Sequence, residues 1–332
     1  MKIRLGSKRC WLVAILLAMA ALIGPSLFSR LASPWRVLRV VATSDALGLN
    51  DNAPGTPLRI ASYNIAHGRG LAESNWEGGD QAERLERLDR IAELLLKINA
   101  DVVVLNEVDF DSSWSHSVNQ AAYLAQKAGY PHRFEQRSFD LRVAFWTWRF
   151  GNAILSKHPI TNARIVDAPG YSRWETLLIG KKRNVVGDIQ FGDETIRLVG
   201  AHLSHRSEAL RVEAARKLIE IAETSPWPTL VVGDLNSTPP GYPESNQTPN
   251  GNNAIMTFDE SGLFQRSPSE GPLLEMDLTF HSMDPRRVID WILIPRAWEF
   301  QRYRVDPSQH SDHRLVYADV MPDPMTTPED PD

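Results

Sequence analysis

The stretch TLVVGDLN, residues 229–236, combines an apolar run with a polar ending. Its first residues are β-branched or aliphatic and predict a buried strand, because such side chains pack well in a sheet. Asp234 and Asn236 then follow where another Val or Leu would be expected, and residues two apart on a strand point to the same face. The stretch therefore predicts a strand that carries polar groups at its end.

The same pattern recurs in other apolar runs of the chain. Burying a polar group without a partner costs about 1–3 kcal/mol, and more if the group is charged. One such residue is usually a satisfied structural group, whereas many at strand ends are better explained by one shared pocket. We therefore expect the following side chains to meet: Asn64, Glu107, His202, Asp234, Asn236, Asp290, Asp312 and His313.

Strand-like runs alternate with fewer helices in the central part of the chain. Several strands are apolar on both faces, which indicates sheets that are covered on each side. Two packed sheets with helices outside would explain this, and a single parallel sheet is the alternative. The expected strands are 58–65, 101–108, 151–157, 183–191, 195–204, 229–236, 288–295 and 314–320, and the expected helices are 82–99, 117–129 and 207–224.

The chain of 332 residues divides into four expected segments. Residues 1–28 have a basic head and an apolar stretch, as in a signal peptide or an uncleaved signal-anchor. Residues 29–57 are expected to be a linker, and residues 58–320 to be one catalytic domain. Residues 321–332 are acidic and rich in proline, so we expect a disordered tail. This organisation predicts an exported protein, anchored in the membrane with its domain outside the cytoplasm.

Composition excludes several classes of protein. The net charge of -5 gives no global basic field that would recruit nucleic acid or anionic membrane. Cys10, the single cysteine of the sequence, lies in the targeting segment. Disulfides and a cysteine zinc cage are therefore excluded.

The residue types at the strand ends suit metal-assisted hydrolysis of a phosphoester. Asn64, Glu107 and Asp312 offer hard oxygen ligands for Mg²⁺, with Mn²⁺ as the alternative. His202 and Asn236 can donate to a phosphoryl oxygen. These three ligands and two donors would hold the metal and the phosphate.

A further set of residues would handle the attacking water. Asp290 can orient His313, as a carboxylate commonly orients an imidazole. Asp234 is a second candidate for positioning the water. The residues alone do not decide whether the histidine or an aspartate takes the proton.

Two other interpretations stay open from the residues. The pairs His202/His205 and His310/His313 have the His-x-x-His spacing of some zinc sites, although residues three apart on a strand point to opposite faces. A catalytically silent module that only binds phosphate ligands is the second alternative. Such a module would be expected to lack at least one of the metal or phosphate residues, and none is missing.

The motifs SYNI, NEV, GNAILS, AHLS, GDLN, IDWILI and SDH occur in this order. Their order and spacing resemble the endonuclease/exonuclease/phosphatase superfamily, which includes pancreatic DNase, abasic-site endonucleases, neutral sphingomyelinases and inositol-polyphosphate 5-phosphatases. The resemblance covers about residues 58–320. It implies an α/β fold, a four-layer α-β-β-α sandwich with two mixed sheets face to face.

The resemblance also implies roles for matching residues. Asn64 and Glu107 would help to bind the metal, Asp312 would assist the metal or the water, and His202 and Asn236 would contact the scissile phosphate. Asp234 would orient water, and Asp290 would pair with His313. Asn152 in GNAILS matches the family pattern as a phosphate contact or as a structural residue.

The substrate is less well defined than the reaction. We expect a monomer that hydrolyses a phosphodiester or phosphomonoester, with a lipid headgroup favoured slightly over DNA or RNA. The tyrosine that lines the phosphate in some DNA-acting members is not identified here. Trp146 and Trp148 in FDLRVAFWTWRF suit a lipid-facing loop or a core strand, and the core is favoured. The basic turn GKKRN, residues 180–184, suits a solvated hairpin tip better than a phosphate contact.

Overall fold

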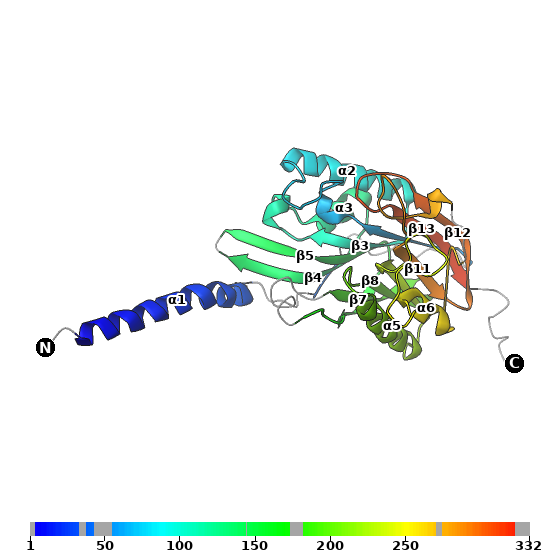
Figure 1. Cartoon of the computed structure of the whole chain (residues 1–332). Helices are drawn as coiled ribbons and strands as arrows, with labels where there is room; N and C mark the ends of the chain where they lie inside the picture. Colours follow the sequence, from blue (N-terminus) through cyan, green and yellow to red (C-terminus); the bar gives the residue numbers. More distant parts are fainter. Residues whose placement is uncertain are drawn as a thin grey trace.

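The computed structural model describes residues 4–32, 38–42, 55–143, 145–172, 182–269 and 274–322. Within these residues two mixed β-sheets pack face to face (Figure 1). The first sheet has the order β1-β4-β5-β3-β2-β13-β12, with β1 Leu38–Ala42, β2 Leu58–Asn64, β3 Val102–Asp109, β4 His132–Val143, β5 Trp146–Ser156, β12 Trp298–Asp306 and β13 Leu315–Pro322. The second has the order β10-β11-β9-β8-β7-β6, with β6 Ile160–Asp167, β7 Arg183–Phe191, β8 Glu194–His202, β9 Thr229–Asp234, β10 Phe264–Arg266 and β11 Asp290–Pro295.

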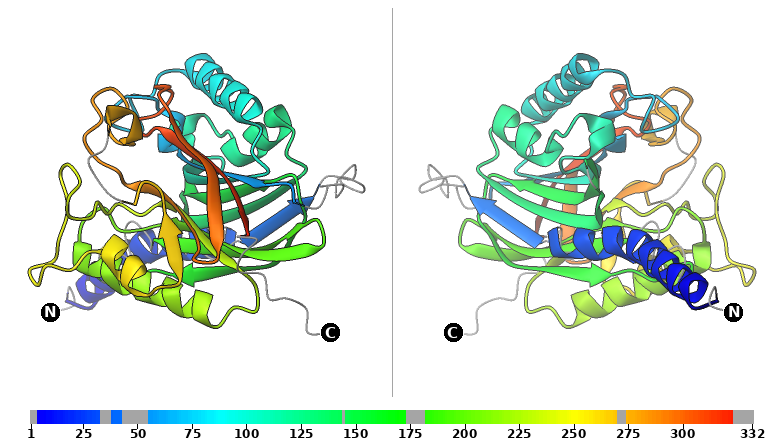
Figure 2. Two further views of the ribbon diagram at one scale, coloured as in Figure 1. Left: turned by 90° about the vertical axis from the view of Figure 1, so that its right-hand side faces the viewer. Right: turned by 90° about the vertical axis from the view of Figure 1, so that its left-hand side faces the viewer.

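Helices cover the outer face of each sheet, as Figure 2 shows from both sides. Helices α2 (Gln81–Ile98) and α3 (Gln120–Ala128) pack on the first sheet, and α5 (Glu208–Glu223) and α6 (Ala254–Glu260) on the second. Helix α2 begins at a capping box formed by Asp80 and Glu83, which satisfies free N–H groups of the first turn. Short 3-10 turns are η1 (Ala66–Gly68), η2 (Ser113–Ser115) and η3 (Glu275–Asp277). The four-layer α-β-β-α sandwich is therefore confirmed.

Strand β2 shows why the sheets are apolar on both faces. Ile60 lies in the core between the two sheets, together with Val104 and Val232. Its neighbours Ala61 and Tyr63 point to the other side and pack under α2 and α3. Burying both faces stabilises the sheet by about 25 cal/mol for each Å² of apolar surface removed from water. The sheets are mixed, with parallel pairing in β2–β3 and β8–β9, so the alternative of a single parallel sheet is wrong.

The N-terminal part differs in one respect from the expected linker. Leu38–Ala42 forms β1, which pairs antiparallel with β4 at the edge of the first sheet. The run LRVVA has enough β-branched residues to add a strand there. Helix α1 (Arg4–Ala32) extends away from the sandwich in Figure 1. No helix in the described ranges combines the length and the apolar character needed to pass through a lipid bilayer. Residues 323–332, most of the expected tail, lie outside the described part.

Candidate active site

The polar strand ends meet around one cavity of about 270 Å³. Strand register explains the convergence, because Asp234 on β9 lies opposite Asp290 on β11 and opposite His202 on β8. Of the predicted site residues, the wall of this catalytic cavity contains Glu107, His202, Asp234, Asn236, Asp312 and His313. The wall also contains Arg69, His205, Arg211, Asn246, Phe280, Arg287 and Ile289.

Asp290 and His313 form a buried pair beneath the cavity. Nδ1 of His313 lies 2.9 Å from one carboxylate oxygen of Asp290 and 3.2 Å from the other. Burial alone would lower the pKa of His313, but the charge and hydrogen bond of Asp290 outweigh burial and raise this pKa. The Nε2 atom of His313 faces Asp234, with 3.9 Å between Nε2 and Oδ2. The pair therefore presents an oriented, proton-bearing imidazole to the cavity.

Asp234 is held by amides on several sides. Its Oδ2 accepts from Nδ2 of Asn64 at 3.1 Å, and its Oδ1 accepts from the backbone N–H of Asn236 at 2.9 Å. Its own N–H donates to Oδ1 of Asn106 at 2.9 Å. Burial raises the pKa of Asp234, and the neighbouring carboxylate of Asp290 raises it further. A rigid carboxylate with a raised pKa is suited to accept a proton from water.

His202 is buried at the end of β8 beside a lysine. Nζ of Lys182 lies 2.6 Å from Nε2 of His202, so the neutral imidazole can accept a hydrogen bond from the ammonium group. Burial lowers the pKa of His202, and the positive charge of Lys182 lowers it further. Lys182 belongs to the basic turn 180–184, of which residues 180 and 181 lie outside the described part. The expected solvated tip therefore includes one cation that reaches the site.

Glu107 and Asp312 face each other across Arg69. Nη2 of Arg69 lies 2.6 Å from Oδ2 of Asp312, and Nη1 lies 3.5 Å from Oε2 of Glu107. Glu107 has a φ of 53° at a β-bulge of β3, where the register with β5 shifts, and such a bulge re-aims a side chain. Burial alone would raise the pKa of Glu107, but the surrounding cations outweigh it and lower this pKa. Glu107 is therefore built to remain charged beside a cation.

A second histidine–aspartate pair stands behind Glu107. Nδ1 of His67 lies 2.8 Å from Oδ1 of Asp109, whose Oδ2 accepts from Nε1 of Trp114 at 2.6 Å. Nε2 of His67 then lies 3.4 Å from Oε2 of Glu107. This chain of contacts orients the carboxylate of Glu107, and neither His67 nor Asp109 was among the predicted site residues.

The donor set fits a hard divalent cation. The guanidinium of Arg69 spans Glu107 and Asp312, which shows that both carboxylates reach one positive charge. Carboxylate oxygens are the ligands that Mg²⁺ prefers in proteins. A second acidic group consists of Asp234, Asp290 and His313, whose ligand atoms lie within 4.8 Å of one another. In that group, however, His313 is already hydrogen-bonded to Asp290, so Glu107 and Asp312 are better placed to receive an ion.

Besides Asp290, two predicted residues lie beside the cavity and not on its wall. Oδ1 of Asn64 accepts from the N–H of Ala66 at 3.0 Å, while its amide group donates to Asp234. Asn152 is buried, donates to the carbonyl of Arg183 at 2.8 Å, and accepts from Asn106 at 2.9 Å. The structure therefore places Asn152 in a network that holds the strands together, and places Asn64 as a partner of Asp234.

Asn106 was not predicted, although it is central to this network. Its Nδ2 donates to Asn152 and to the carbonyl of Ala201, and its Oδ1 accepts from Asp234. It thus connects the two sheets directly beneath the site. Asn106 precedes Glu107 in the motif NEV, and a buried amide at that position was the signal that could have identified it.

The two His-x-x-His pairs are arranged differently from a shared zinc site. His202 and His205 both line the catalytic cavity, but His310 lines a separate cavity from His313. Among the described residues, the one group of three close ligand atoms contains a single histidine. The geometry therefore favours an oxygen-ligated ion over zinc.

The aromatic segment is more exposed than the favoured core interpretation expected. Phe145 is 80% exposed and Trp146 is 42% exposed, at the end of the hairpin formed by β4 and β5. Trp146 packs against Trp76, with ring centroids 5.6 Å apart, and Trp76 packs in turn against Trp114. Trp148 is partly covered, by stacking on Trp114. The exposed aromatic tip, defined as Trp76, Phe145 and Trp146, therefore connects to the site through Trp114 and His67.

Comparisons with known proteins agree with this arrangement. The model of the endonuclease/exonuclease/phosphatase family matches residues 61–313. A search of curated proteins found no match.

Solved structures show the same fold at low identity. An endonuclease/exonuclease/phosphatase from Beutenbergia cavernae is 21% identical, with a TM-score of 0.55 over 80% of this chain and 72% of that chain. A mannosyl-6-phosphatase from Bacteroides thetaiotaomicron is 15% identical, with a TM-score of 0.54 over 80% of this chain and 99% of that chain. A humanized TDP2 from D. rerio is 15% identical, with a TM-score of 0.55 over 80% of this chain and 98% of that chain.

Proposed function

This chain belongs to the endonuclease/exonuclease/phosphatase family, whose members act on phosphoester bonds, and we propose that it is a metal-dependent phosphoester hydrolase. The single observation that carries this proposal is the catalytic cavity. It brings together the oriented His313, Asp234 as the proton acceptor, and the carboxylates of Glu107 and Asp312. A catalytically silent binding module is not supported, because every residue predicted to bind the metal or the phosphate is present in the chain.

The chain's residues can carry a direct attack of water on phosphorus. Asp234 would take the proton of the water as its oxygen bonds to phosphorus, while the bond from phosphorus to the leaving alcohol breaks. Nε2 of His313 would donate to a phosphoryl oxygen, because Asp290 holds Nδ1 and leaves Nε2 towards Asp234. His202 and Asn236 line the same wall and would bind the remaining oxygens. The departing alkoxide takes its proton from solvent.

Glu107 and Asp312 would hold the divalent ion, with Asn64 steadying Asp234 beside them. When bound, a magnesium ion would neutralise charge on the phosphate. His67 would keep the carboxylate of Glu107 in place through its contact of 3.4 Å. Arg69 would have to release both carboxylates.

Purified full-length protein tests this function directly. We expect hydrolysis of a phosphodiester that chelator abolishes and that Mg²⁺ or Mn²⁺ restores. Asp234→Asn should lower kcat by about 10²- to 10⁴-fold, the usual contribution of general acid–base catalysis. Full activity of Asp234→Asn, or activity that survives exhaustive chelation, would contradict the assignment.

We further propose a lipid-like phosphodiester as the substrate class. The exposed aromatic tip supports this, because Trp and Phe side chains suit the interface between water and lipid. Phe145→Ser with Trp146→Ser should lower hydrolysis of sphingomyelin or phosphoinositide in vesicles and leave a soluble phosphodiester unaffected. Trp227→Ser is a matched control, since Trp227 is 41% exposed outside this tip. Faster cleavage of plasmid DNA than of either lipid would favour a nuclease instead.

Export and membrane attachment remain part of the proposal. The basic head and the apolar run of residues 11–23 support it, and side chains such as Trp11 and Leu22 are exposed on α1. Fractionation of cells that express the full chain checks this, with accessibility of the domain to external protease as the readout. Recovery of the protein wholly within the cytoplasm would refute it.

A further inference from the structure

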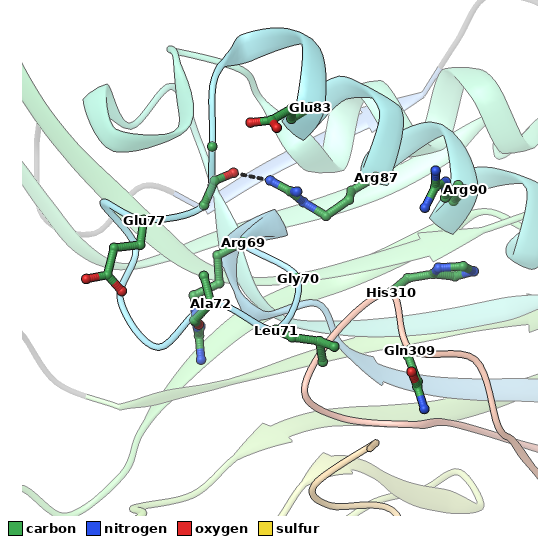
Figure 3. A pocket seen from close by; sticks show the side chains of 12 residues that line it. Arg69, Gly70, Leu71, Ala72, Glu77, Glu83, Arg87, Arg90, Gln309 and His310 are labelled. Carbon is green, nitrogen blue, oxygen red and sulfur yellow. Dashed lines mark hydrogen bonds between the residues drawn. The ribbon is translucent and has the colours of Figure 1, made fainter.

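A second cavity of about 370 Å³ lies beside the catalytic cavity, and the mechanism does not use it (Figure 3). Helix α2 forms one side with Arg87 and Arg90, and the loop with Gln309 and His310 faces the helix. The remaining wall is the segment that joins η1 to α2. The lining residues are Arg69, Gly70, Leu71, Ala72, Glu77, Gly78, Gly79, Glu83, Arg87, Arg90, Gln309 and His310.

Arg87 carries a positive charge that no carboxylate neutralises directly. Within the described part of the chain it forms no ion pair, and its guanidinium donates to the carbonyls of Gly68, at 3.1 Å, and Gly78. The dashed line in Figure 3 marks one hydrogen bond of Arg87 to a backbone carbonyl. Burial lowers the pKa of Arg87, and the negative charges of Glu83 and Glu86 offset this lowering only in part. A guanidinium has five N–H donors, and two carbonyl contacts leave donors for a ligand.

Neighbouring residues of α2 add to this charge. Arg84, one turn before Arg87, is buried and donates to the carbonyls of His67, at 3.2 Å, and Asn75. Among the described residues, the ion-pair partner of Arg90, one turn after, is the exposed Glu86, and such surface pairs contribute little. The three arginines are therefore spaced three residues apart on α2, and Arg87 and Arg90 line the cavity.

The acidic residues of the lining are engaged elsewhere. Oε2 of Glu83 accepts from the N–H of Asp80 at 2.9 Å, in the capping box of α2. Oε2 of Glu77 accepts from the N–H of Ser74 at 3.3 Å. In Figure 3 the carboxylate of Glu77 points away from Arg87 and Arg90. Both carboxylates keep their charge, but the lining contains three arginines against these two, which leaves a net attraction to an anion.

Arg69 connects this cavity to the catalytic one, because it lines both. The loop that carries Gln309 and His310 continues to Asp312 and His313, so the two cavities share a second segment as well. A small substrate could thus place one group in each cavity. We propose that the arginine-lined cavity is a subsite for a second phosphate group of the substrate, which rests on the proposed function for its first phosphate.

The first test measures binding of inorganic phosphate to metal-free full-length protein by calorimetry. Wild-type protein should bind two phosphates, and Arg87→Gln with Arg90→Gln should abolish one site or weaken it at least tenfold. Lys97→Gln is the matched control, because it removes an exposed cation of α2 outside the cavity. Arg87→Lys retains the charge and should retain phosphate binding. Equal stoichiometry and affinity in the wild type and the double variant would overturn the subsite.

The second test separates the subsite from the proposed function. Glycerophosphoinositol and glycerophosphoinositol 4-phosphate differ by one phosphate, and wild-type kcat/KM should be at least tenfold higher for the second. The double variant should lose this preference and keep its rate on the first compound. If no compound is hydrolysed while phosphate binding follows the expected pattern, the proposed function fails and the anion site stands. If both compounds are hydrolysed equally and independently of Arg87 and Arg90, the subsite fails and the function stands.

Discussion

At the scale of single residues, the pairing of Asp290 with His313 makes a sharp kinetic prediction. Asp290→Asn retains the size of the side chain but removes the charge that orients and protonates the imidazole. We expect kcat on a phosphodiester to fall by about 10²- to 10⁴-fold with little change in KM. Steady-state kinetics at saturating Mg²⁺ measure this.

A buried ion pair elsewhere provides the control for that substitution. Asp188 binds Arg197 at 2.8 Å within the second sheet, and neither residue lines the catalytic cavity. Asp188→Asn should lower the free energy of unfolding by about 3 kcal/mol or more yet leave kcat per folded molecule intact. If Asp290→Asn retains activity within a factor of three, His313 works without its carboxylate partner.

Arg69 makes a second prediction at this scale, on metal affinity. Its guanidinium contacts Asp312 and Glu107, so an incoming cation must displace it. Arg69→Gln removes this competitor, and we expect Mg²⁺ to bind about tenfold more tightly by calorimetry. The carboxylates would also repel each other without a cation, so Mg²⁺ should raise the Tm of the variant more than that of the wild type. Unchanged binding would show that Arg69 does not compete with the ion, and weaker binding that it supports the ion.

At the scale of elements, the end of strand β9 depends on Gly233. This residue has a φ of 143°, and a Cβ there would lie 2.0 Å from the backbone oxygen of Ala201 on β8. Gly233→Ala must therefore separate β8 from β9 and displace Asp234. We expect a loss of at least about 2 kcal/mol in unfolding free energy, measured by denaturant titration, together with lower activity.

Gly262 is the matched control for this substitution. It also has a positive φ, of 67°, but a Cβ there would meet nothing within 4 Å. Gly262→Ala should cost only about 1 kcal/mol and leave activity unchanged. Equal effects of the two substitutions would mean that backbone conformation matters and contact with β8 does not.

Elements with an apolar run were predictable, and more polar elements were not. The runs that end in Asn64, Glu107, His202 and Asp234 form strands as expected, because their side chains are buried on both faces. Strand β4 was missed, since HRFEQRSFDLRV alternates apolar and polar residues unevenly. Its buried Asp140 is satisfied by Arg137 and Arg149, and only the folded sheet supplies Arg149 from β5.

At the scale of the whole molecule, a buried histidine should make stability depend on pH. The ring of His158 is buried against Phe191, and neither ring nitrogen has a hydrogen-bond partner among the described residues. Burial lowers the pKa of His158 in the folded chain. The unfolded chain, with an ordinary pKa of about 6.5, therefore takes up this proton first as the pH falls. The stability that depends on neutral His158 is complete above about pH 6.5 and is lost below it.

His158→Phe should isolate this contribution. Between pH 7.5 and 5.5, the unfolding free energy of the variant relative to the wild type should rise by about 1 kcal/mol. Histidines with raised pKa, such as His313, change stability in the opposite sense but are common to both proteins. Phe191→Leu disturbs the same packing without removing a titratable group, so its effect should be independent of pH. If the difference in unfolding free energy between His158→Phe and the wild type does not change with pH, the prediction is contradicted.

The sequence by itself determined the apolar strands, their order and the polar residues at their ends. Those features follow from local rules, because strand propensity and the cost of burying a polar group depend on residues that are close in the sequence. Only the tertiary structure decided which of these residues share a cavity. It joined Asp312 to Arg69, which is 243 residues away, and moved Asn152 into a structural network. It also revealed the arginine-lined cavity, since the periodicity of α2 shows a charged face but not the loop that closes over it.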